Sequence, residues 1–272
     1  MDRNQQLNVV FNTVAMMRMR SKRTVMLTES SGDTDLYKKF VGPTCFVSSA
    51  NNRSGVIELL ERLANNRVPA AVGIVDSDDD FALNRKSPRD DVARTDATDK
   101  ETTIMASNAF EDFCISERAT LPFEQIRREV FSAVMPLGLI RRYSAIEDWG
   151  LDFKPIRVQD FLTLNVTCDL HRCMDAVLQA NPHIDITKAD LQEAFAHADL
   201  KALAVAQIVR GHDATAVLAF RSRELFHAEK DQREIEEGLS RAYERRHFDE
   251  TGTCAHLKLL EAGFPAGFTL FT

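Results

Sequence analysis

The sequence has few of the residues that mark fibrous, disulfide-bonded or membrane-spanning proteins. Among 272 residues there are only 11 glycines, 8 prolines, one tryptophan and five cysteines. Such a composition excludes collagen-like and disordered chains, and no apolar run is long enough to span a membrane. An odd number of scattered cysteines fits a reducing compartment better than a disulfide framework. Because polar residues near the start also interrupt any secretory signal, we expect a cytoplasmic protein.

Common catalytic motifs are missing as well. The sequence has no GxxxxGKS phosphate loop, so any ATP hydrolysis must come from a partner. No spacing indicates a Ser or Cys catalytic triad. Cys168, His171 and Cys173 resemble a zinc motif, but only offsets of three or four residues share a helix face, and Cys173 lies five residues from Cys168. We therefore expect no zinc site there.

The charge balance narrows the function further. The chain has 34 basic and 41 acidic residues, a formal net charge of -7. Such a protein does not coat nucleic acid by bulk electrostatics. The net charge does not exclude an enzyme that acts on nucleic acid, because such an enzyme needs only local carboxylates for a metal and local cations for phosphate. With 44% apolar residues, the chain can form one large or two small domains around a real core.

The hydrophobic pattern predicts an α/β half followed by a helical half. Helical spacing of Leu7, Phe11 and Val14 predicts a helix over 4–18, with this stripe buried against the protein's own core, a second copy or a partner. Short apolar stretches then alternate with helical windows, which indicates a parallel sheet covered on both faces. The expected strands are 24–28, 44–48, 70–75 and 92–95. The expected helices are 34–40, 55–65, 109–114, 123–135, 168–179, 188–206 and 214–250.

Acidic residues directly follow two of the expected strands. Glu29 follows the first strand, and Asp76, Asp78 and Asp80 follow the third. Ligands of an open parallel sheet collect outside the carboxyl ends of its strands. If these two strands are neighbours or near-neighbours, Glu29, Asp76 and Asp78 converge at one edge. Clustered carboxylates repel one another unless a divalent cation neutralises them, and oxygen ligands select Mg²⁺ or Mn²⁺. The pattern therefore predicts a metal site at this edge.

Other interpretations of the acidic segments remain open. Residues 76–80 could form an acidic surface turn. An EF-hand is excluded, because its sixth position is Phe81 rather than Gly and its twelfth is Ser87 rather than Glu. A third acidic group follows the fourth expected strand: Asp96, Asp99 and Glu101. This group would either form a second metal site or complement the dipole of a helix that begins there.

Several segments together resemble a known family. Glu29, with Asp33 four residues later and GIVDSDDD at 73–80, is similar to the Toprim pattern of a catalytic Glu after the first strand and Asp-x-Asp after the third. Three further segments resemble a Toprim-like bacterial family, formerly of unknown function, that includes the nuclease effector of the PARIS anti-phage system: RTDATDKETTIMAS at 94–107, VRGHD at 209–213 and LSRAYERRHF at 239–248. The similarity covers residues 23–260 approximately. Ser30 stands where the family has Gly, and Thr98 where it has His.

This resemblance implies both an architecture and an activity. It implies a Toprim-like parallel sheet flanked by helices over 23–118, preceded by an amphipathic helix and basic segment at 1–22 and followed by a mainly helical region at 119–272. The implied activity is metal-dependent cleavage of nucleic acid, favouring RNA such as tRNA, by a toxic anti-phage effector. An ABC-type ATPase would be the controlling partner. We also expect a homodimer without membrane association.

The nuclease hypothesis gives each candidate residue a role. Asp76 and Asp78 would hold Mg²⁺ or Mn²⁺, and Glu29 would complete the coordination or act as general acid/base. Three more acids are candidates for a second metal or for support: Asp80, Asp99 and Glu101. The resemblance adds four supporting residues: Asp33, Arg210, His212 and Asp213. Arg210 would clamp phosphate, and His212 and Asp213 would form an orienting pair near the site. Alternatively, Asp213 caps a helix and His212 is a histidine with satisfied hydrogen bonds. The basic segment would bind nucleic acid: Arg18, Arg20, Lys22 and Arg23.

Two other functions are compatible with these residues. A phosphatase of the haloacid dehalogenase type also has Asp-x-Asp after a strand, with Asp76 as the nucleophile that forms an aspartyl-phosphate. The chain could also be a non-catalytic subunit that binds an ATPase and retains a decayed Toprim shell. Metal binding and the effect of changing Glu29 separate these alternatives from the nuclease.

Overall fold

The chain forms two compact units. The computed structural model describes residues 3–163 and 166–271. The first unit combines Met1–Asp76, Lys86–Asp96 and Glu244–Thr272, and the second combines Ser77–Arg85 and Ala97–Tyr243. The ranges expected from the sequence are consecutive, whereas each unit joins distant segments. The reason lies in the C-terminal segment, which binds the sheet unit through bonds such as Gly42 N–H to the Leu270 carbonyl at 2.7 Å.

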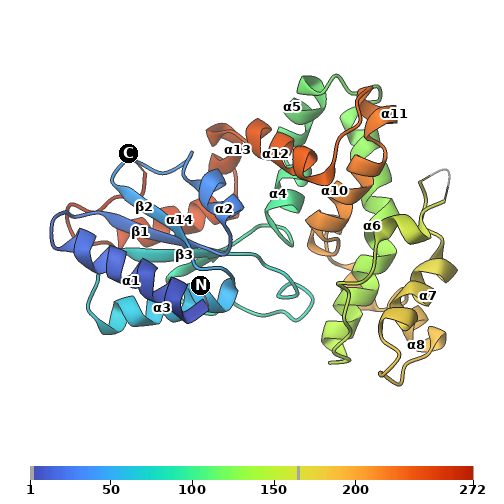
Figure 1. The fold of residues 1–272 in the computed structure, drawn as a ribbon, viewed down its shortest axis with the longest axis horizontal. Coiled ribbons are helices and arrows are strands. Elements are labelled where there is room, and N and C mark those ends of the chain that lie inside the picture. The colour runs from blue at the N-terminus through green and yellow to red at the C-terminus, as the bar shows by residue number, and fades with distance from the viewer. Residues whose placement is uncertain (1–2, 164–165, 272) are drawn as a thin grey trace. The chain divides into compact units, whose positions relative to one another are not determined.

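A four-stranded parallel sheet forms the centre of the first unit (Figure 1). Its strands are β1 (Thr24–Thr28), β2 (Cys45–Ser49), β3 (Ala71–Val75) and β4 (Val92–Arg94), in the order β2-β1-β3-β4. The register pairs Met26 of β1 with Val72 of β3. The predicted parallel sheet with flanking helices is therefore confirmed and is consistent with a Toprim-like α/β fold. Because β1 and β3 are neighbours, the residues that follow them start from adjacent positions.

Helices cover both faces of this sheet (Figure 1). On one face lie α1 (Arg3–Arg18) and α3 (Arg53–Asn65), where fully buried Leu7 and Val14 pack in a core with Leu27 and Leu59. The predicted burial of the first helix's stripe is confirmed, and the unit's own core provides it. Burying each such side chain contributes about 1.5–3 kcal/mol. The opposite side carries α2 (Ser31–Tyr37), α13 (Arg245–Asp249) and α14 (Gly252–Ala262).

The second unit is built from helices. Its longer ones are α5 (Ala109–Ser116), α6 (Phe123–Ile146), α7 (Leu170–Ala180), α10 (Gly211–Phe220) and α12 (Gln232–Ala242). Shorter ones are α4 (Lys100–Ala106), η1 (Val158–Phe161), α8 (Lys188–Glu193), α9 (Ala198–Lys201), η2 (Val205–Gln207) and α11 (Ser222–Phe226). Within the described ranges, no helix combines the length and apolar character needed to cross a membrane.

Several predicted helix boundaries in this half are wrong. The helix expected to end before Pro136 continues to Ile146 as α6. The range 188–206 divides into α8, α9 and η2, and 214–250 divides into four helices. His227 has a left-handed φ of 55° after α11, and the Asp231 side chain caps the start of α12. Capping and chain reversal interrupt segments whose composition alone favours a continuous helix.

Candidate functional site

The carboxyl ends of β1 and β3 bring Glu29 and Asp76 together. All five residues of β1 are buried. Glu29, the first residue after β1, is half-buried at the carboxyl edge of the sheet. The backbone N–H of Asp76 donates to Glu29 Oε1 at 2.9 Å. Arg53 Nη1 donates to the Asp76 carbonyl at 3.4 Å. Glu29 and Asp76 therefore lie close together within the first unit, as predicted.

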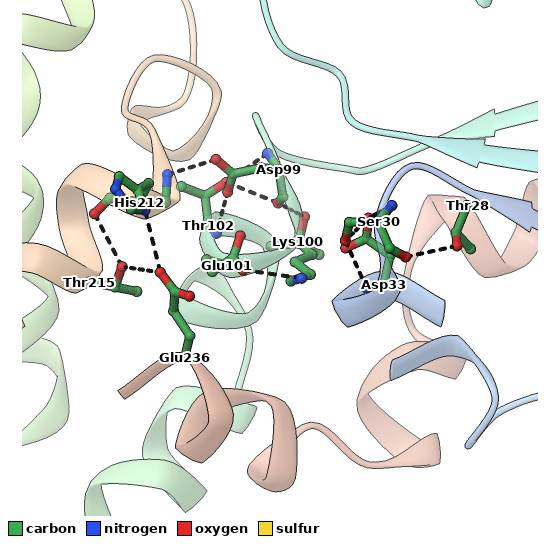
Figure 2. Close-up of polar contacts among 12 residues, drawn as sticks. Thr28, Ser30, Asp33, Asp99, Lys100, Glu101, Thr102, His212, Thr215 and Glu236 are labelled. Atoms are coloured by element: carbon green, nitrogen blue, oxygen red, sulfur yellow. Dashed lines mark hydrogen bonds and ion pairs between the residues drawn. The ribbon is translucent and has the colours of Figure 1, made fainter. Parts of the chain in front are cut away.

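The backbone after Glu29 is held by a helix cap. Ser30 Oγ accepts from the Asp33 N–H at 3.1 Å, and Asp33 Oδ2 accepts from the Ser30 N–H at 3.0 Å and from Ser30 Oγ at 2.7 Å (Figure 2). These reciprocal bonds form a capping box at the start of α2. Ser30 thus supplies the cap of α2. Asp33 fixes the backbone directly after Glu29, and its supporting role at a catalytic site stays a prediction.

Asp78 belongs to the second unit and sits in a strained turn. Its φ of 43° is left-handed, and its N–H donates to the Thr98 carbonyl at 2.8 Å. Burial raises the pKa of the Asp78 carboxyl, Arg210 opposes this increase, and Asp79 adds to it. Asp80 is buried, and its carbonyl accepts from the Arg85 N–H at 2.8 Å. The turn is therefore a built structure rather than a solvated acidic loop.

A buried arginine stabilises this turn and was not among the predicted site residues. Arg142 is 2% exposed, and its Nη1 donates to Asp79 Oδ1. Its Nη2 donates to Thr98 Oγ1 at 2.9 Å, and that hydroxyl donates to the Ala206 carbonyl at 3.1 Å. The Thr98 hydroxyl is thus an acceptor for the guanidinium. The only sequence signal was the Arg141–Arg142 pair, because its partners lie 63 and 44 residues away.

Asp99 joins the beginnings of two helices. Its Oδ1 accepts from the Thr102 N–H at 2.9 Å and from Thr102 Oγ1 at 2.8 Å, which caps α4 (Figure 2). Its Oδ2 accepts from the N–H of Gly211, the first residue of α10, at 2.7 Å. Any Cβ at Gly211 would collide with the Asp99 carboxylate and the Glu101 side chain. Both oxygens thus have a structural use, and a metal-binding role for Asp99 stays a prediction.

Asp96 likewise accepts hydrogen bonds at the start of a helix, in the first unit. Its carboxylate accepts from the Gly252 N–H at 2.6 Å, from the Thr253 N–H at 2.7 Å and from Thr253 Oγ1 at 2.7 Å. These bonds hold the beginning of α14 against the end of β4. Asp96 therefore attaches the C-terminal segment to the sheet.

Among the predicted site acids, Glu101 has the most strongly shifted pKa. Burial, followed by the charge of Asp99, raises the pKa of Glu101 to about 7, and Lys100 opposes the shift. The Lys100 Nζ lies 3.4 Å from Glu101 Oε1 (Figure 2). A carboxyl that titrates near neutrality can exchange a proton under physiological conditions.

The expected orienting pair, His212 and Asp213, has separate partners. His212 Nδ1 lies 2.8 Å from Gln232 Nε2 and 3.5 Å from Glu236 Oε1, and Glu236 raises the pKa of His212 (Figure 2). Asp213 Oδ2 accepts from Arg141 Nη1 at 2.6 Å. The structure therefore does not direct the two side chains to a common partner. Arg210 is exposed and close enough to Asp78 to oppose the increase in its pKa.

The predicted basic segment consists of one structural arginine at the end of α1 and three exposed cations after it. Arg18 Nη2 donates to the carbonyls of Pro69 and Ala70, the latter at 3.2 Å, and its guanidinium lies 4.5 Å from the Phe268 ring centre. Burial lowers the pKa of Arg18. Arg18 is therefore used in packing the first unit. Three residues remain exposed candidates for nucleic acid: Arg20, Lys22 and Arg23.

The donor chemistry of the sheet edge suits a hard divalent cation. Glu29 and Asp76 offer carboxylate oxygens, the ligands that Mg²⁺ and Mn²⁺ prefer. Among the described residues, no three or more His, Cys, Asp or Glu side chains are arranged as a group that could hold a metal ion. Metal binding by Glu29 and Asp76 is thus a matter for proposal. In comparisons with known proteins, no family model matches this sequence and no curated protein is similar to it.

Proposed function

We propose that this chain is a metal-dependent nuclease whose Mg²⁺ or Mn²⁺ ligands include Glu29 and Asp76. The supporting observation is the bond from the Asp76 N–H to Glu29 Oε1 at 2.9 Å, at the carboxyl ends of neighbouring parallel strands. A bound metal would polarise the scissile phosphate and stabilise the charge on the leaving oxygen. Asp78 would serve as the second acid of the Asp-x-Asp motif.

The chain's own residues would orient the carboxylates. The N–H of Asp76 holds the Glu29 carboxylate at the strand end, and the capping box of Ser30 and Asp33 holds the following backbone. Arg53 binds the Asp76 carbonyl and so fixes the end of β3. Reacting groups that are held in place before substrate binds reduce the entropy cost of reaching the transition state.

The biological setting in this proposal rests on the resemblance alone. RNA such as tRNA would be the substrate, cleavage would be toxic, and an ABC-type ATPase would restrain it until a phage trigger is sensed. A homodimer belongs to the same proposal. Each of these statements can fail while the nuclease activity stands, so the activity is tested first.

The first experiment measures cleavage directly. Purified protein with Mg²⁺ is incubated with separate pools of tRNA, plasmid DNA and single-stranded DNA. Glu29→Gln removes the charge but keeps an acceptor for the Asp76 N–H, and Glu61→Gln changes a glutamate on α3 that is 57% exposed. We expect cleavage of tRNA by wild type and Glu61→Gln, and about a 10²–10⁴-fold lower rate for Glu29→Gln. Thermal unfolding confirms that each variant is folded.

Two results would contradict the proposed metal-dependent mechanism. Wild-type cleavage by Glu29→Gln would reject the role of Glu29, and cleavage that persists in excess EDTA would reject metal dependence. An Asp76 that forms a stable fluoroberyllate adduct would instead support the phosphatase. A folded chain that cleaves none of the pools and binds no Mn²⁺ would support the non-catalytic subunit.

A further inference from the structure

A polar pocket of about 340 Å³ lies within the second unit, beside the acidic turn. The C-terminal part of α6 and the loop 148–154 form its walls, together with Asp79 and Arg210. Its volume is at the lower end of the range for small-molecule sites. Three cationic side chains line it: Arg141, Lys154 and Arg210.

Arg141 is a fixed cation with an unused donor. Its Nη1 donates to Asp213 at 2.6 Å, and its guanidinium lies 4.8 Å from the Phe153 ring centre. The side chain is only 10% exposed, and its buried Nε has no hydrogen-bond partner. A buried donor without a partner costs about 1–3 kcal/mol, so this guanidinium has hydrogen-bonding capacity that the protein itself does not use.

Two of the three acids that line the pocket have partners, whereas two of its cations have none in the part of the chain that the structure describes. Asp79 is paired with Arg142, and Asp152 Oδ1 accepts from the Lys154 N–H at 2.9 Å. Among the described residues, the side chains of Lys154 and Arg210 have no hydrogen bond or ion pair. One exposed acid, Asp148, remains at the pocket. Lys154 and Arg210 therefore have donors available for a ligand with several acceptor oxygens.

The loop that carries Phe153 and Lys154 is fixed by a buried asparagine. Asn181 is 1% exposed, its Oδ1 accepts from the Asp152 N–H at 2.7 Å, and its Nδ2 donates to the Asp152 carbonyl at 3.0 Å and the Val177 carbonyl at 2.9 Å. The loop is thus held on α7 before any ligand binds. A site formed in advance loses less free energy to ordering upon binding.

We infer that this pocket binds the phosphate group of a nucleotide unit, through Arg141, Lys154 and Arg210. Guanidinium groups match the oxygens of phosphate in pairs, and an ammonium adds a point charge. The assignment of this phosphate to the nucleic-acid substrate rests on the proposed function. The affinity for phosphate itself does not, because none of these residues is a proposed metal ligand.

The test measures binding without metal, by calorimetry in EDTA at low salt. The probes are AMP, inorganic phosphate, adenosine and a single-stranded oligonucleotide without terminal phosphate. We expect AMP and phosphate to bind competitively and adenosine not to bind. Arg210→Gln and Lys154→Gln should each weaken AMP about tenfold, the effect of one charge-assisted hydrogen bond. The controls Arg157→Gln and Lys201→Gln change exposed cations outside the pocket and should alter affinity less than about twofold.

Arg141 is tested through the ring that supports it, because removing Arg141 would also leave Asp213 without its partner. Phe153→Leu removes the ring under the guanidinium and should weaken AMP about threefold, as expected for a loss of one cation–π contact. Each variant's thermal unfolding is compared with that of wild type.

Three outcomes would overturn the inference or its extension. Adenosine that binds as tightly as AMP would show that the pocket recognises the nucleoside instead of phosphate. Unchanged AMP affinity in both Arg210→Gln and Lys154→Gln would remove the pocket from the binding site. An oligonucleotide that fails to compete with AMP would assign the pocket to a free nucleotide and separate it from the nuclease. Because the binding measurements contain no metal, they can be interpreted even if the protein proves to have no nuclease activity.

Discussion

The two acidic segments that follow β3 and β4 have similar compositions but different uses. After β3, Asp78 lies in a left-handed turn, with Arg142 and Arg210 providing opposing charge. After β4, Asp96 and Asp99 place their carboxylates on the N–H groups that begin α14, α4 and α10. An acid whose oxygens accept from helix starts stabilises the fold. An acid whose burial raises its pKa is unfavourable for the fold in its charged form.

This difference predicts that some of these acids contribute to the stability of the fold and others to activity. Substitution of Asp96 or Asp99 should make the protein unfold more easily, and substitution of Asp78 should reduce activity. Natural proteins keep unfavourable local features mainly where function requires them. The predictions below test this division in order of decreasing effect.

The largest effect is expected at Asp78. Asn tolerates the left-handed backbone, so Asp78→Asn should keep the fold and remove only the charge. We expect about a 10²–10⁴-fold loss of nuclease rate with an unfolding temperature equal to or above that of wild type. The control is Asp185→Asn, at an exposed aspartate of the same unit. A stable Asp78→Asn protein with wild-type activity would break the comparison.

Asp99 should show the opposite behaviour. Asp99→Ala removes the cap of α4 and leaves the buried Gly211 N–H without an acceptor. Together these losses should lower the free energy of unfolding by about 2–4 kcal/mol in urea denaturation. Asp99→Asn retains an acceptor and should recover part of this stability. Equal stability of Asp99→Ala and wild type would show that the cap has no importance.

Gly211 tests the close approach of α10 to α4. Gly211→Ala places a Cβ against Asp99 and Glu101 and should lower the free energy of unfolding by about 1–3 kcal/mol. Gly263→Ala serves as the control, because its nearest neighbour is 3.4 Å away and its φ is -88°. If both alanine variants unfold at the same denaturant concentration, the approach is looser than described.

The smallest effect is a pH dependence at the surface. Glu236 raises the pKa of His212, so this pair stabilises the protein below about pH 6.5 and loses that contribution as pH rises through the higher folded-state pKa. The His212 side chain is 73% exposed, which limits the contribution to less than about 0.5 kcal/mol. His212→Gln should therefore destabilise the protein more at pH 6 than at pH 8 in urea unfolding. A larger loss at pH 8 would contradict this sign.

Much of the sheet could be predicted from the sequence because its patterns are local. The apolar run of β1, Thr24–Thr28, coincides with the observed strand, and the parallel direction of the strands follows from their alternation with helices. The sequence left open whether β1 and β3 are neighbours, and the structure shows that they are. The approach of Glu29 to Asp76 follows in turn from that pairing. The helical half was harder, since a composition rich in Ala, Leu and Glu favours helix without indicating where the chain reverses.

The partners of the site residues were the least predictable part. Asp213 pairs with Arg141 across 72 residues, and Arg142 reaches Asp79 across 63 residues. Neither pair has a spacing signal, because tertiary packing alone brings α6 to α10 and to the turn. The capping role of Asp99 was recognisable as an alternative, since an acid three residues before a Thr at a helix start is a local pattern.

The most direct test of the central claim is metal binding at the sheet edge. Mn²⁺ is titrated by calorimetry into wild type, Glu29→Gln, Asp76→Asn and the control Glu61→Gln, with thermal unfolding as a check of folding. We predict that wild type and Glu61→Gln bind Mn²⁺ equally, and that Glu29→Gln and Asp76→Asn each bind it at least about tenfold more weakly. Absence of Mn²⁺ binding by wild type, or equal affinity in all four proteins, would contradict the account.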